Sequence, residues 1–318
     1  MAAPTNTVTT LTTVGVREDL EDVIYRVAPE ETPFISNIGK AKASAIRHEW
    51  QTESLASPNP ANAALEGDDV ATLEAGNSTA RVSNICQIFR KTFGVSRTQE
   101  IVDKAGRASE LNRQKVLKGI ELRRDMEARF IGNFASVAES GSTPRGSAGA
   151  LAWLTTNASR GGGGSNGGFS SGIVAAATNG TQRTFSETLL KTALALAFGN
   201  GGRPSQAYMG PAHKQQFSAF TGIAAIRHEV GGPKPAQIIG AADVYVSDFG
   251  NLTLIPHPYG LTRDCLLADP EMFAVGVLDG TKSKRLGDTG DTEKHIMTNE
   301  STLICRNEKA HAVVADLT

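Results

Sequence analysis

The alternation of polar and apolar residues predicts two extended limbs in the first third of the chain. One limb covers residues 48–55 and the other residues 80–89, and residues 57–69 between them hold hardly any apolar side chain. At about 3.3 Å per residue, a limb of about 20 residues reaches about 60 Å. A hairpin of that length without a core of its own is marginal in water. We therefore expect it to lie on a neighbour, and the nearest candidate is a second copy of the chain.

From residue 98 onward the pattern changes from extended to helical. Gly106 is expected to separate a short helix from a long one over residues 107–134. About 28 residues at 1.5 Å each form a rod of about 40 Å. The other faces of this rod mix basic and acidic residues, which is typical of a solvated surface and allows only weak contact with nucleic acid. The apolar stripe that predicts its buried face consists of Val116, Gly119, Leu122, Met126, Phe130 and Phe134.

The segment before the limbs predicts an arm with two short helices. Residues 1–16 are polar and rich in threonine, which is typical of a mobile or partner-bound terminus. Residues 17–27 have one apolar helical face and end before Pro29. Residues 32–39 predict a second short helix that ends at Gly39. Two interpretations stay open: these helices dock on another molecule, or they pack on their own domain.

The middle of the chain predicts a compact α/β block. Residues 150–154 predict a short buried strand, and the glycine-dominated residues 160–171 predict a flexible loop. A phosphate-binding loop is the alternative for residues 160–171, but no Gly-Lys-Ser or Gly-Lys-Thr follows. The spacing from Thr184 to Glu187 predicts a capped helix that Gly199 ends. Its expected inward residues are Leu190, Ala193, Leu194, Ala197 and Phe198.

Pro211 is expected to begin a further helix that runs to Phe220. Short apolar runs predict strands around it and in the tail of the chain. The expected strands are residues 207–209, 244–246, 252–255, 265–267, 272–278, 295–305 and 311–317.

Composition narrows the class of protein. The 318 residues are 40% hydrophobic and 20% charged, which excludes disorder throughout the chain. A net charge of −1 and a pI near 6.6 argue against a dedicated nucleic-acid binder. Cys86, Cys265 and Cys305 show no CxxC spacing, so we expect reduced, buried thiols. No apolar run is long enough for a membrane span and no signal peptide is present, so we expect a soluble protein made in the cytoplasm.

Each motif that suggests catalysis is incomplete. Asp288-Thr289-Gly290 matches the aspartic-protease triplet, but that chemistry needs two such carboxylates and one triplet is present. His48-Glu49 and His228-Glu229 lack the second histidine of a zinc-protease motif. The acidic tip of the hairpin could meet a cation or a basic neighbour, although it lacks the EF-hand pattern. Its members are Glu66, Asp68, Asp69 and Glu74. We assign no catalytic, cofactor-binding or metal residues.

Nine short segments occur in order along the chain: GVREDL (15–20), ETPF (31–34), HEWQT (48–52), ALEGDD (64–69), NICQI (84–88), RASEL (107–111), WLTTN (153–157), VSDFG (246–250) and STLICRNEKA (301–310). Each segment alone is weak, but the ordered set resembles the major capsid proteins of a group of tailed bacteriophages. The resemblance covers essentially the whole chain.

This resemblance implies an α+β chain with the Hong Kong 97-type capsid fold. It implies an N-terminal arm (1–46), an extended loop laid over a neighbouring subunit (47–97) and a peripheral domain with a long spine helix (98–149). It further implies an axial α/β domain (150–262) and a tail that returns to the peripheral sheet (263–318). The implied function is that of a non-enzymatic shell subunit in the virion, closing as pentamers and hexamers around double-stranded DNA.

Two departures from the wider fold modify this expectation. No lysine lies between Lys42 and Lys91, so we expect no covalent cross-link through the loop. About 15 residues precede the matched region, so we expect a separate scaffolding protein, with a portal and decoration proteins as further partners. Two alternatives stay open: an encapsulin-type compartment with an enzyme cargo, and a soluble α/β enzyme with an unrecognised site.

Overall fold

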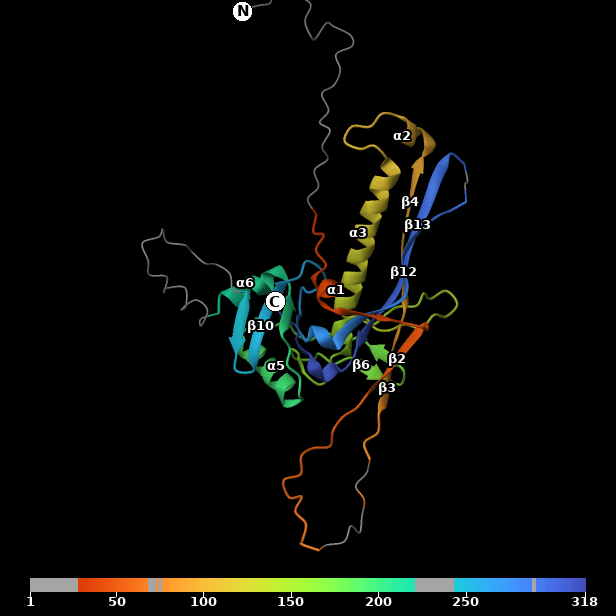
Figure 1. Ribbon diagram of the computed structural model, residues 1–318. Helices are drawn as coiled ribbons and strands as arrows, with labels where there is room; N and C mark the ends of the chain where they lie inside the picture. The colour runs from red at the N-terminus through yellow and green to blue at the C-terminus, as the bar shows by residue number, and fades with distance from the viewer. Residues whose placement is uncertain (1–27, 68–72, 74–75, 221–242, 288–289) are drawn as a thin grey trace, which may run out of the picture.

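The computed structural model describes residues 28–67, 73, 76–220, 243–287 and 290–318. The helix predicted at residues 17–27 lies outside these ranges. Figure 1 shows an elongated half built on long strands and α3, a more compact half around α5 and α6, and a loop that leaves the body below β2 and β3. The two halves share one apolar interior at their junction, where Phe34, Tyr208 and Phe273 belong to the same buried cluster.

A four-stranded sheet forms the elongated half, in the order β1, β12, β13, β4. β12 pairs antiparallel with β13, and β13 pairs antiparallel with β4 along the whole of β4. The polar second half of β12 extends well beyond the predicted strand at 272–278, because pairing with β13 holds it. The bounds are β1 (Gly39–Lys42), β4 (Gln87–Ser96), β12 (Phe273–Arg285) and β13 (Thr292–Cys305).

The long helix α3 (Glu110–Ile131) packs on one face of this sheet. The Ser109 hydroxyl caps it by accepting a hydrogen bond from the amide of Asn112. The short helix α2 (Arg97–Ile101) comes before it, and Gly106 between them has φ of 70°, which confirms the predicted break. The stripe of Leu122, Met126 and Phe130 is buried as predicted.

The prediction is wrong at both ends of that stripe. Val116 is 63% exposed, and Phe134 is 42% exposed and lies beyond the end of the helix. Ser109 and Gly132 limit α3 to a shorter span than residues 107–134. Gly132 adopts an extended conformation, which ends the helical path before Phe134 is reached.

A six-stranded mixed sheet forms the compact half, in the order β5, β14, β11, β8, β10, β9. Helix α5 packs on it through Leu190, Ala193, Leu194 and Ala197, as predicted. The bounds are β5 (Ala158–Ser159), α5 (Glu187–Gly199), β8 (Gln206–Met209), α6 (Pro211–Ser218), β9 (Val244–Ser247), β10 (Gly250–Pro256), β11 (Cys265–Ala268) and β14 (Ala312–Val314).

Two details of α5 differ from prediction. The capping hydroxyl belongs to Ser186, which accepts from the amide of Leu189, and the helix therefore begins two residues later than a cap at Thr184 implies. Phe198 is 44% exposed and stacks on Phe249 of the β9–β10 turn, with ring centres 4.8 Å apart.

The strands after residue 263 divide between the two sheets. β12 and β13 join the four-stranded sheet, whereas β11 and β14 lie inside the six-stranded sheet. This differs from a tail that returns wholly to one sheet. The physical reason is that all residues of β11 are buried, which suits a central strand between β14 and β8.

Two local predictions in the middle of the chain are wrong. Residues 150–153 form a helical turn, α4 (Ala150–Trp153), because a short apolar run does not distinguish a buried helical turn from a strand. The glycine-rich segment is packed and contains β6 (Gly168–Ser170), which pairs with β7 (Ile173–Ala175). A Cβ atom on Gly161 would lie 2.0 Å from the carbonyl oxygen of Thr181, so glycine permits close packing here.

The first described helix, α1 (Pro33–Asn37), packs on its own domain. Phe34 is fully buried, and its ring centre lies 5.4 Å from those of Tyr208 and Phe273. For residues 33–37 the second of the two open interpretations therefore holds. The remaining elements are β2 (Arg47–Thr52), β3 (Ala80–Ile85) and the short 3-10 turns η1 (Pro270–Met272) and η2 (Glu308–Ala310).

Candidate functional site

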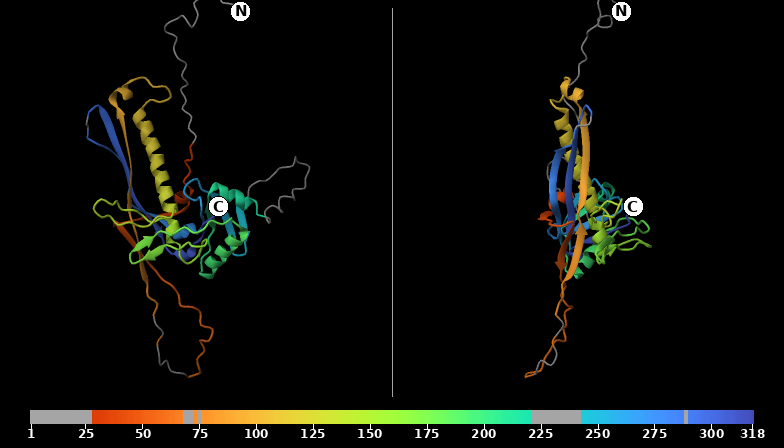
Figure 2. Two further views of the ribbon diagram at one scale, coloured as in Figure 1. Left: turned by 180° about the vertical axis from the view of Figure 1, so that it is seen from behind. Right: turned by 90° about the vertical axis from the view of Figure 1, so that its right-hand side faces the viewer.

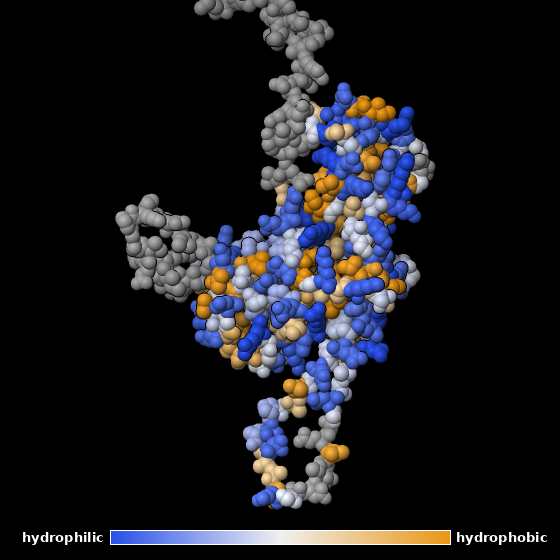
Figure 3. Space-filling view, in the orientation of Figure 1, coloured by the Kyte–Doolittle hydropathy of each residue, from blue (hydrophilic) through white to orange (hydrophobic). Residues whose placement is uncertain are grey.

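We call the segment between β2 and β3, residues 53–79, the exposed loop; its described residues, 53–67, 73 and 76–79, project from the body beyond β2 and β3 (Figures 1 and 2). Leu55, Leu65 and Leu73 are 87%, 82% and 86% exposed. Figure 3 shows the projecting segment as largely hydrophilic or weakly polar, with a few isolated apolar spots. Its described residues therefore bury almost nothing within the subunit. The acidic tip falls partly outside the described residues: Glu66 is exposed, and Asp68, Asp69 and Glu74 are not described.

The paired part of the hairpin is shorter than predicted. β2 and β3 pair over six residues each, Arg47–Thr52 with Ala80–Ile85. The predicted second limb, 80–89, is divided at Cys86, whose amide donates to the carbonyl of Ile46. From Gln87 the chain continues as β4 in the four-stranded sheet, so the loop and the body share one continuous length of backbone.

Buried polar contacts hold the base of the loop against the body. Asn84 is 1% exposed, donates to the carbonyls of Leu303 and Ala148, and accepts from the amide of Ala148. Arg47 donates to the carbonyl of Gly172 at 2.8 Å. A buried amide with several partners is costly to move, so the direction in which the loop leaves the body is fixed.

Aromatic rings support the same base. The ring centres of Trp50 on β2 and Trp153 on α4 lie 5.5 Å apart, and Trp153 stacks on Phe169 of β6. Each ring comes from a different segment, and each such pair stabilises by about 0.5–1.5 kcal/mol beyond burial. This aromatic anchor was not among the features that the sequence predicted. The signal available was that Trp50, Asn84 and Trp153 all lie within the ordered segments quoted above.

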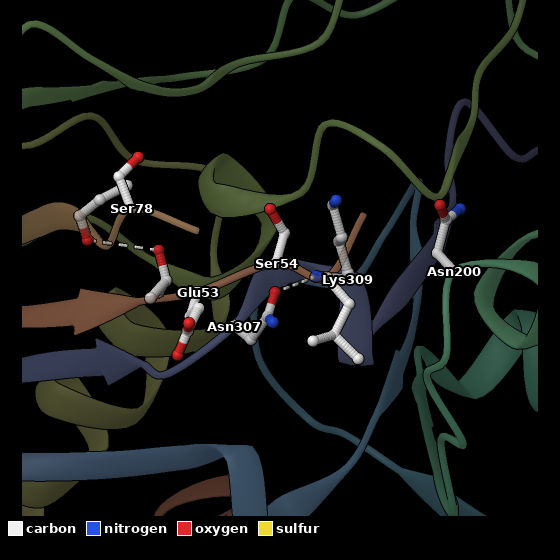
Figure 4. A pocket seen from close by; sticks show the side chains of 9 residues that line it. Glu53, Ser54, Ser78, Asn200, Asn307 and Lys309 are labelled. Atoms are coloured by element: carbon white, nitrogen blue, oxygen red, sulfur yellow. Dashed lines mark hydrogen bonds between the residues drawn. The ribbon is translucent and has the colours of Figure 1, made fainter. Parts of the chain in front are cut away.

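A hollow of about 440 Å³ lies where the loop joins the body (Figure 4). Glu53, Ser54 and Ser78 of the loop face Asn307 and Lys309 across it. The lining is polar and combines one carboxylate with one ammonium group, without a nucleophile and base in contact. This arrangement leaves room at the junction and offers no catalytic constellation.

A second junction connects α1, α3 and the segment after β10. Glu127 is fully buried within α3, and its carboxylate accepts hydrogen bonds from the amides of Phe34 and Ile35 at 2.6 and 2.8 Å. The Nε2 atom of His257 donates to the same carboxylate at 2.8 Å. Burial raises the pKa of the neighbouring Tyr208 to about 12. Three segments far apart in the sequence therefore meet at one carboxylate.

Of the residues considered for catalysis, the structure describes His48, Glu49 and Gly290. His48 lies on β2 beside Trp50, where burial lowers its pKa. Asp288, Thr289 and His228-Glu229 lie outside the described residues. In the part of the chain that the structure describes, no group of three His, Cys, Asp or Glu side chains has metal-binding geometry, and no helix is long and apolar enough to cross a membrane.

The three cysteines are buried and unpaired. Burial raises the pKa of Cys86 to about 11 and that of Cys265 to about 12, and it raises the pKa of Cys305 well above its usual range. The nucleophilic thiolate form is therefore disfavoured at all three positions.

Comparison with known proteins identifies the family. The model of the SU10 major capsid protein family matches residues 3–318. The major capsid protein of Escherichia phage Phieco32 is 36% identical over 113 residues, which cover 36% of this chain and 32% of that protein. The alignment thus spans about a third of the curated relative's length.

Solved capsid structures share the fold across the whole chain. A capsid chain of Cyanophage A-1(L) superposes with a TM-score of 0.68 at 12% identity, covering 98% of this chain and 100% of the other. A chain from a phage G structure that contains major capsid and decoration proteins gives a TM-score of 0.53 at 11% identity, covering 100% of both chains. The α+β fold is that of phage capsid proteins, as the resemblance implied, and the chain belongs to the SU10 major capsid protein family, whose place in the virion is the capsid.

Proposed function

We propose that this chain assembles as pentamers and hexamers into the icosahedral head shell that encloses the double-stranded DNA of a tailed bacteriophage. The observation that carries the proposal is the exposed loop, which has no core of its own and yet is joined to a base held by buried polar and aromatic contacts. A segment whose direction is fixed and whose surface is unburied suits a contact with a neighbouring subunit.

The roles of the segments follow the Hong Kong 97-type fold. Residues 1–46 act as the N-terminal arm, 47–97 as the extended loop and 98–149 as the peripheral domain with α3 as spine helix. Residues 150–262 form the axial domain, which meets its copies at the five- and six-fold axes. Residues 263–318 complete the peripheral domain through β12 and β13, while β11 and β14 complete the axial sheet. The pairing of the strands supports this amended division.

The proposed partners are other copies of the chain, a separate scaffolding protein, a portal and decoration proteins. The phage G structure contains decoration proteins alongside its capsid chains, which supports the last of these for a protein of this fold. Packaged DNA is contacted weakly, since the net charge of the chain is −1. Many modest contacts, each repeated by symmetry, stabilise the shell collectively.

Electron microscopy of the purified chain, with and without its scaffolding partner, tests this proposal. We expect closed shells or capsomer rings, and light scattering to match their diameter. A variant in which residues 55–77 are replaced by an Asn-Gly turn should keep the far-ultraviolet circular dichroism of a folded subunit and form no closed shells. A monomer or dimer under every condition refutes shell assembly, and normal shells from the shortened variant refute the role of the loop.

A further inference from the structure

The strands at the base of the exposed loop form a sheet of their own, which we call the ribbon. β2 and β3 pair with each other and with no other strand of the described residues. A ribbon of two strands is marginally stable in water, so the surfaces that it touches must set the direction in which it points. One of these surfaces is the glycine-rich segment, which contains β6 beside the ribbon (Figure 1).

Residues 160–181, which we call the bracket, form two paired limbs and not a flexible loop. Backbone hydrogen bonds between β6 and β7, and at a bridge further from their turn, hold the limbs together. The glycines permit close contact. A Cβ atom on Gly167 would lie 2.2 Å from the carbonyl oxygen of Ala175, and one on Gly180 would lie 2.5 Å from the carbonyl oxygen of Gly161. A side chain at either position would push the limbs apart, so glycine here makes the bracket compact.

The turn between β6 and β7 touches both strands of the ribbon. The carbonyl oxygen of Gly172 accepts hydrogen bonds from Nη1 of Arg47 on β2 at 2.8 Å and from the hydroxyl of Ser83 on β3 at 3.5 Å. Gly172 has a φ of 84°, and Ser171 beside it has a φ of 51°. A residue other than glycine in this conformation is strained by about 1–3 kcal/mol and persists only where the surrounding structure holds it. The turn is therefore a defined contact surface for the ribbon.

The far end of the bracket is held by Asp316, which follows β14. Its side chain is fully buried, and its carboxylate accepts hydrogen bonds from the amides of Gly161 and Gly180 at 3.0 and 2.7 Å. Asp316 also has a positive φ, of 58°. Nη2 of Arg263 lies 3.2 Å from the same carboxylate. Both limbs of the bracket thus end on one carboxylate, and among the described residues none of its hydrogen bonds goes to the ribbon.

The middle of the bracket is tied to the segment that follows α3. The side chain of Asn133 exchanges two hydrogen bonds with the backbone of Ala177, at 2.7 and 2.8 Å. The hydroxyl of Ser136 accepts from the amide of Val174 at 2.7 Å, and Val174 is fully buried. Buried polar contacts of this kind are costly to break. The bracket is therefore fixed to both halves of the subunit before it reaches the ribbon.

We propose that the bracket sets the direction in which the exposed loop leaves the body, and that Asp316 is a positioning residue that acts through it. The assignment rests on the proposed function, because this direction matters only where the loop meets a neighbouring subunit. A ribbon that already points in one direction loses less conformational freedom when that contact forms, which favours association. The glycines of residues 160–181 serve this rigidity.

The distance between two spin labels in the unassembled subunit tests the assignment. The labels are attached through Glu53→Cys, at the first residue of the exposed loop, and Lys115→Cys on α3. Both positions are exposed, whereas the native cysteines are buried. The local variant, Arg47→Ala, removes the donor to the turn of the bracket.

The remote variant is Asp316→Asn. Asparagine tolerates a positive φ, but its NH2 group cannot accept a hydrogen bond, so the two amides of the bracket keep one acceptor oxygen instead of two. Two matched controls make the same substitutions at exposed positions. Arg81→Ala changes an arginine of the ribbon whose side chain is 74% exposed, and Asp243→Asn changes a side chain that is 82% exposed.

We expect a narrow distribution of label distances in the wild type and in both controls. In the local and remote variants its width should increase by at least about twofold, because the ribbon samples more directions. The yield of closed shells should fall by at least about fivefold in the same two variants, since the contact is repeated in every subunit. Circular dichroism checks folding. If the remote variant does not fold, the exposed local variant still decides whether the bracket directs the loop.

Three results overturn the proposal. The first is a wild-type distribution as wide as those of the two variants, because the loop then has no fixed direction. The second is a local and a remote variant with the distributions of their controls, and the third is a widened distribution with a normal yield of shells. The distances are measured without assembly and are independent of the proposed function. If the wild-type chain forms no shells with its scaffolding partner, the proposed function fails even where the distances change as expected.

Discussion

Replacing Glu127 by glutamine removes the charge at the junction of α1, α3 and the segment after β10. The side chain keeps its size and one oxygen, but its new NH2 group faces groups that also donate. Three groups donate to the Glu127 carboxylate: the amides of Phe34 and Ile35 and the Nε2 atom of His257. Phe34 and His257 share one oxygen, and Ile35 uses the other. Because glutamine keeps only one oxygen, at least one and at most two of these donors lose their acceptor. Each buried donor left without a partner costs about 1–3 kcal/mol, so the loss of one or two acceptors should lower the free energy of unfolding by about 1–6 kcal/mol.

The same substitution at Glu121 is the matched control, because Glu121 lies on the same helix, α3, before Glu127 in the sequence and in a more exposed position. The Glu121 carboxylate is 35% exposed, pairs with Lys118 at 2.8 Å and lies 4.0 Å from Lys91. Solvent screens such pairs, so Glu121→Gln should cost about 0–1 kcal/mol. The difference between the two variants isolates the effect of burial.

Urea denaturation under conditions that prevent assembly measures both costs. The two tryptophans of the chain, Trp50 and Trp153, lie against each other and report unfolding by fluorescence. Hydrogen exchange gives the local test. The amides of Phe34 and Ile35 should exchange faster in Glu127→Gln than in the wild type, and at the wild-type rate in Glu121→Gln. Equal losses of stability in the two variants, or unchanged exchange at these amides, would refute the reasoning.

Three further outcomes are expected. Burial raises the pKa of Asp264, so the folded state keeps the carboxyl proton of Asp264 to higher pH than the unfolded state does. The free energy of unfolding therefore falls as the pH rises from about 4 through the raised pKa. Asp264→Asn should remove this decline when the stability is measured by urea denaturation at each pH. Gly161→Ala should destabilise by about 1–3 kcal/mol, because its Cβ meets backbone, whereas Gly162→Ala meets nothing within 4 Å and should be near neutral in the same assay. Purified shells should run as a single band on a denaturing gel, since no lysine lies between Lys42 and Lys91; a ladder of bands would contradict this.

The apolar pattern predicted the elements that carry their own signal. Leu122, Met126 and Phe130 repeat every four residues, and the structure buries all three against the sheet. Gly106 is the predicted break between two helices, and in the structure it adopts a positive φ, which glycine tolerates. The exposed loop was predicted as an unburied segment because it holds few apolar side chains. In each of these cases, the structure that the local sequence favours is also the one that the residues adopt in the folded subunit.

The errors occur where a distant partner decides the structure. The polar half of β12 has no apolar alternation, and β13 alone holds it in the sheet. Glu127 is one of many charges on a charged helix, and only the arrival of α1 and His257 makes it a buried acceptor. Asn84 likewise becomes an anchor only when the chain near Leu303 packs against it. No spacing rule within one segment contains this information.

The anchored base of the exposed loop connects the structure of one subunit with the proposed contact between subunits. Asn84 and the ring of Trp50 fix the base of the loop within one subunit. In the proposed contact between subunits the loop therefore starts from an anchored base and not from a fully flexible chain, which lowers the entropy cost of association. Contacts between solvent-exposed charges are individually weak and sensitive to salt. A subunit that docks wrongly can therefore dissociate, whereas a correct lattice repeats the contact around every capsomer and becomes stable through its number of contacts. If the loop makes the proposed contact, weak polar contacts on an anchored base favour correction during growth and stability after closure.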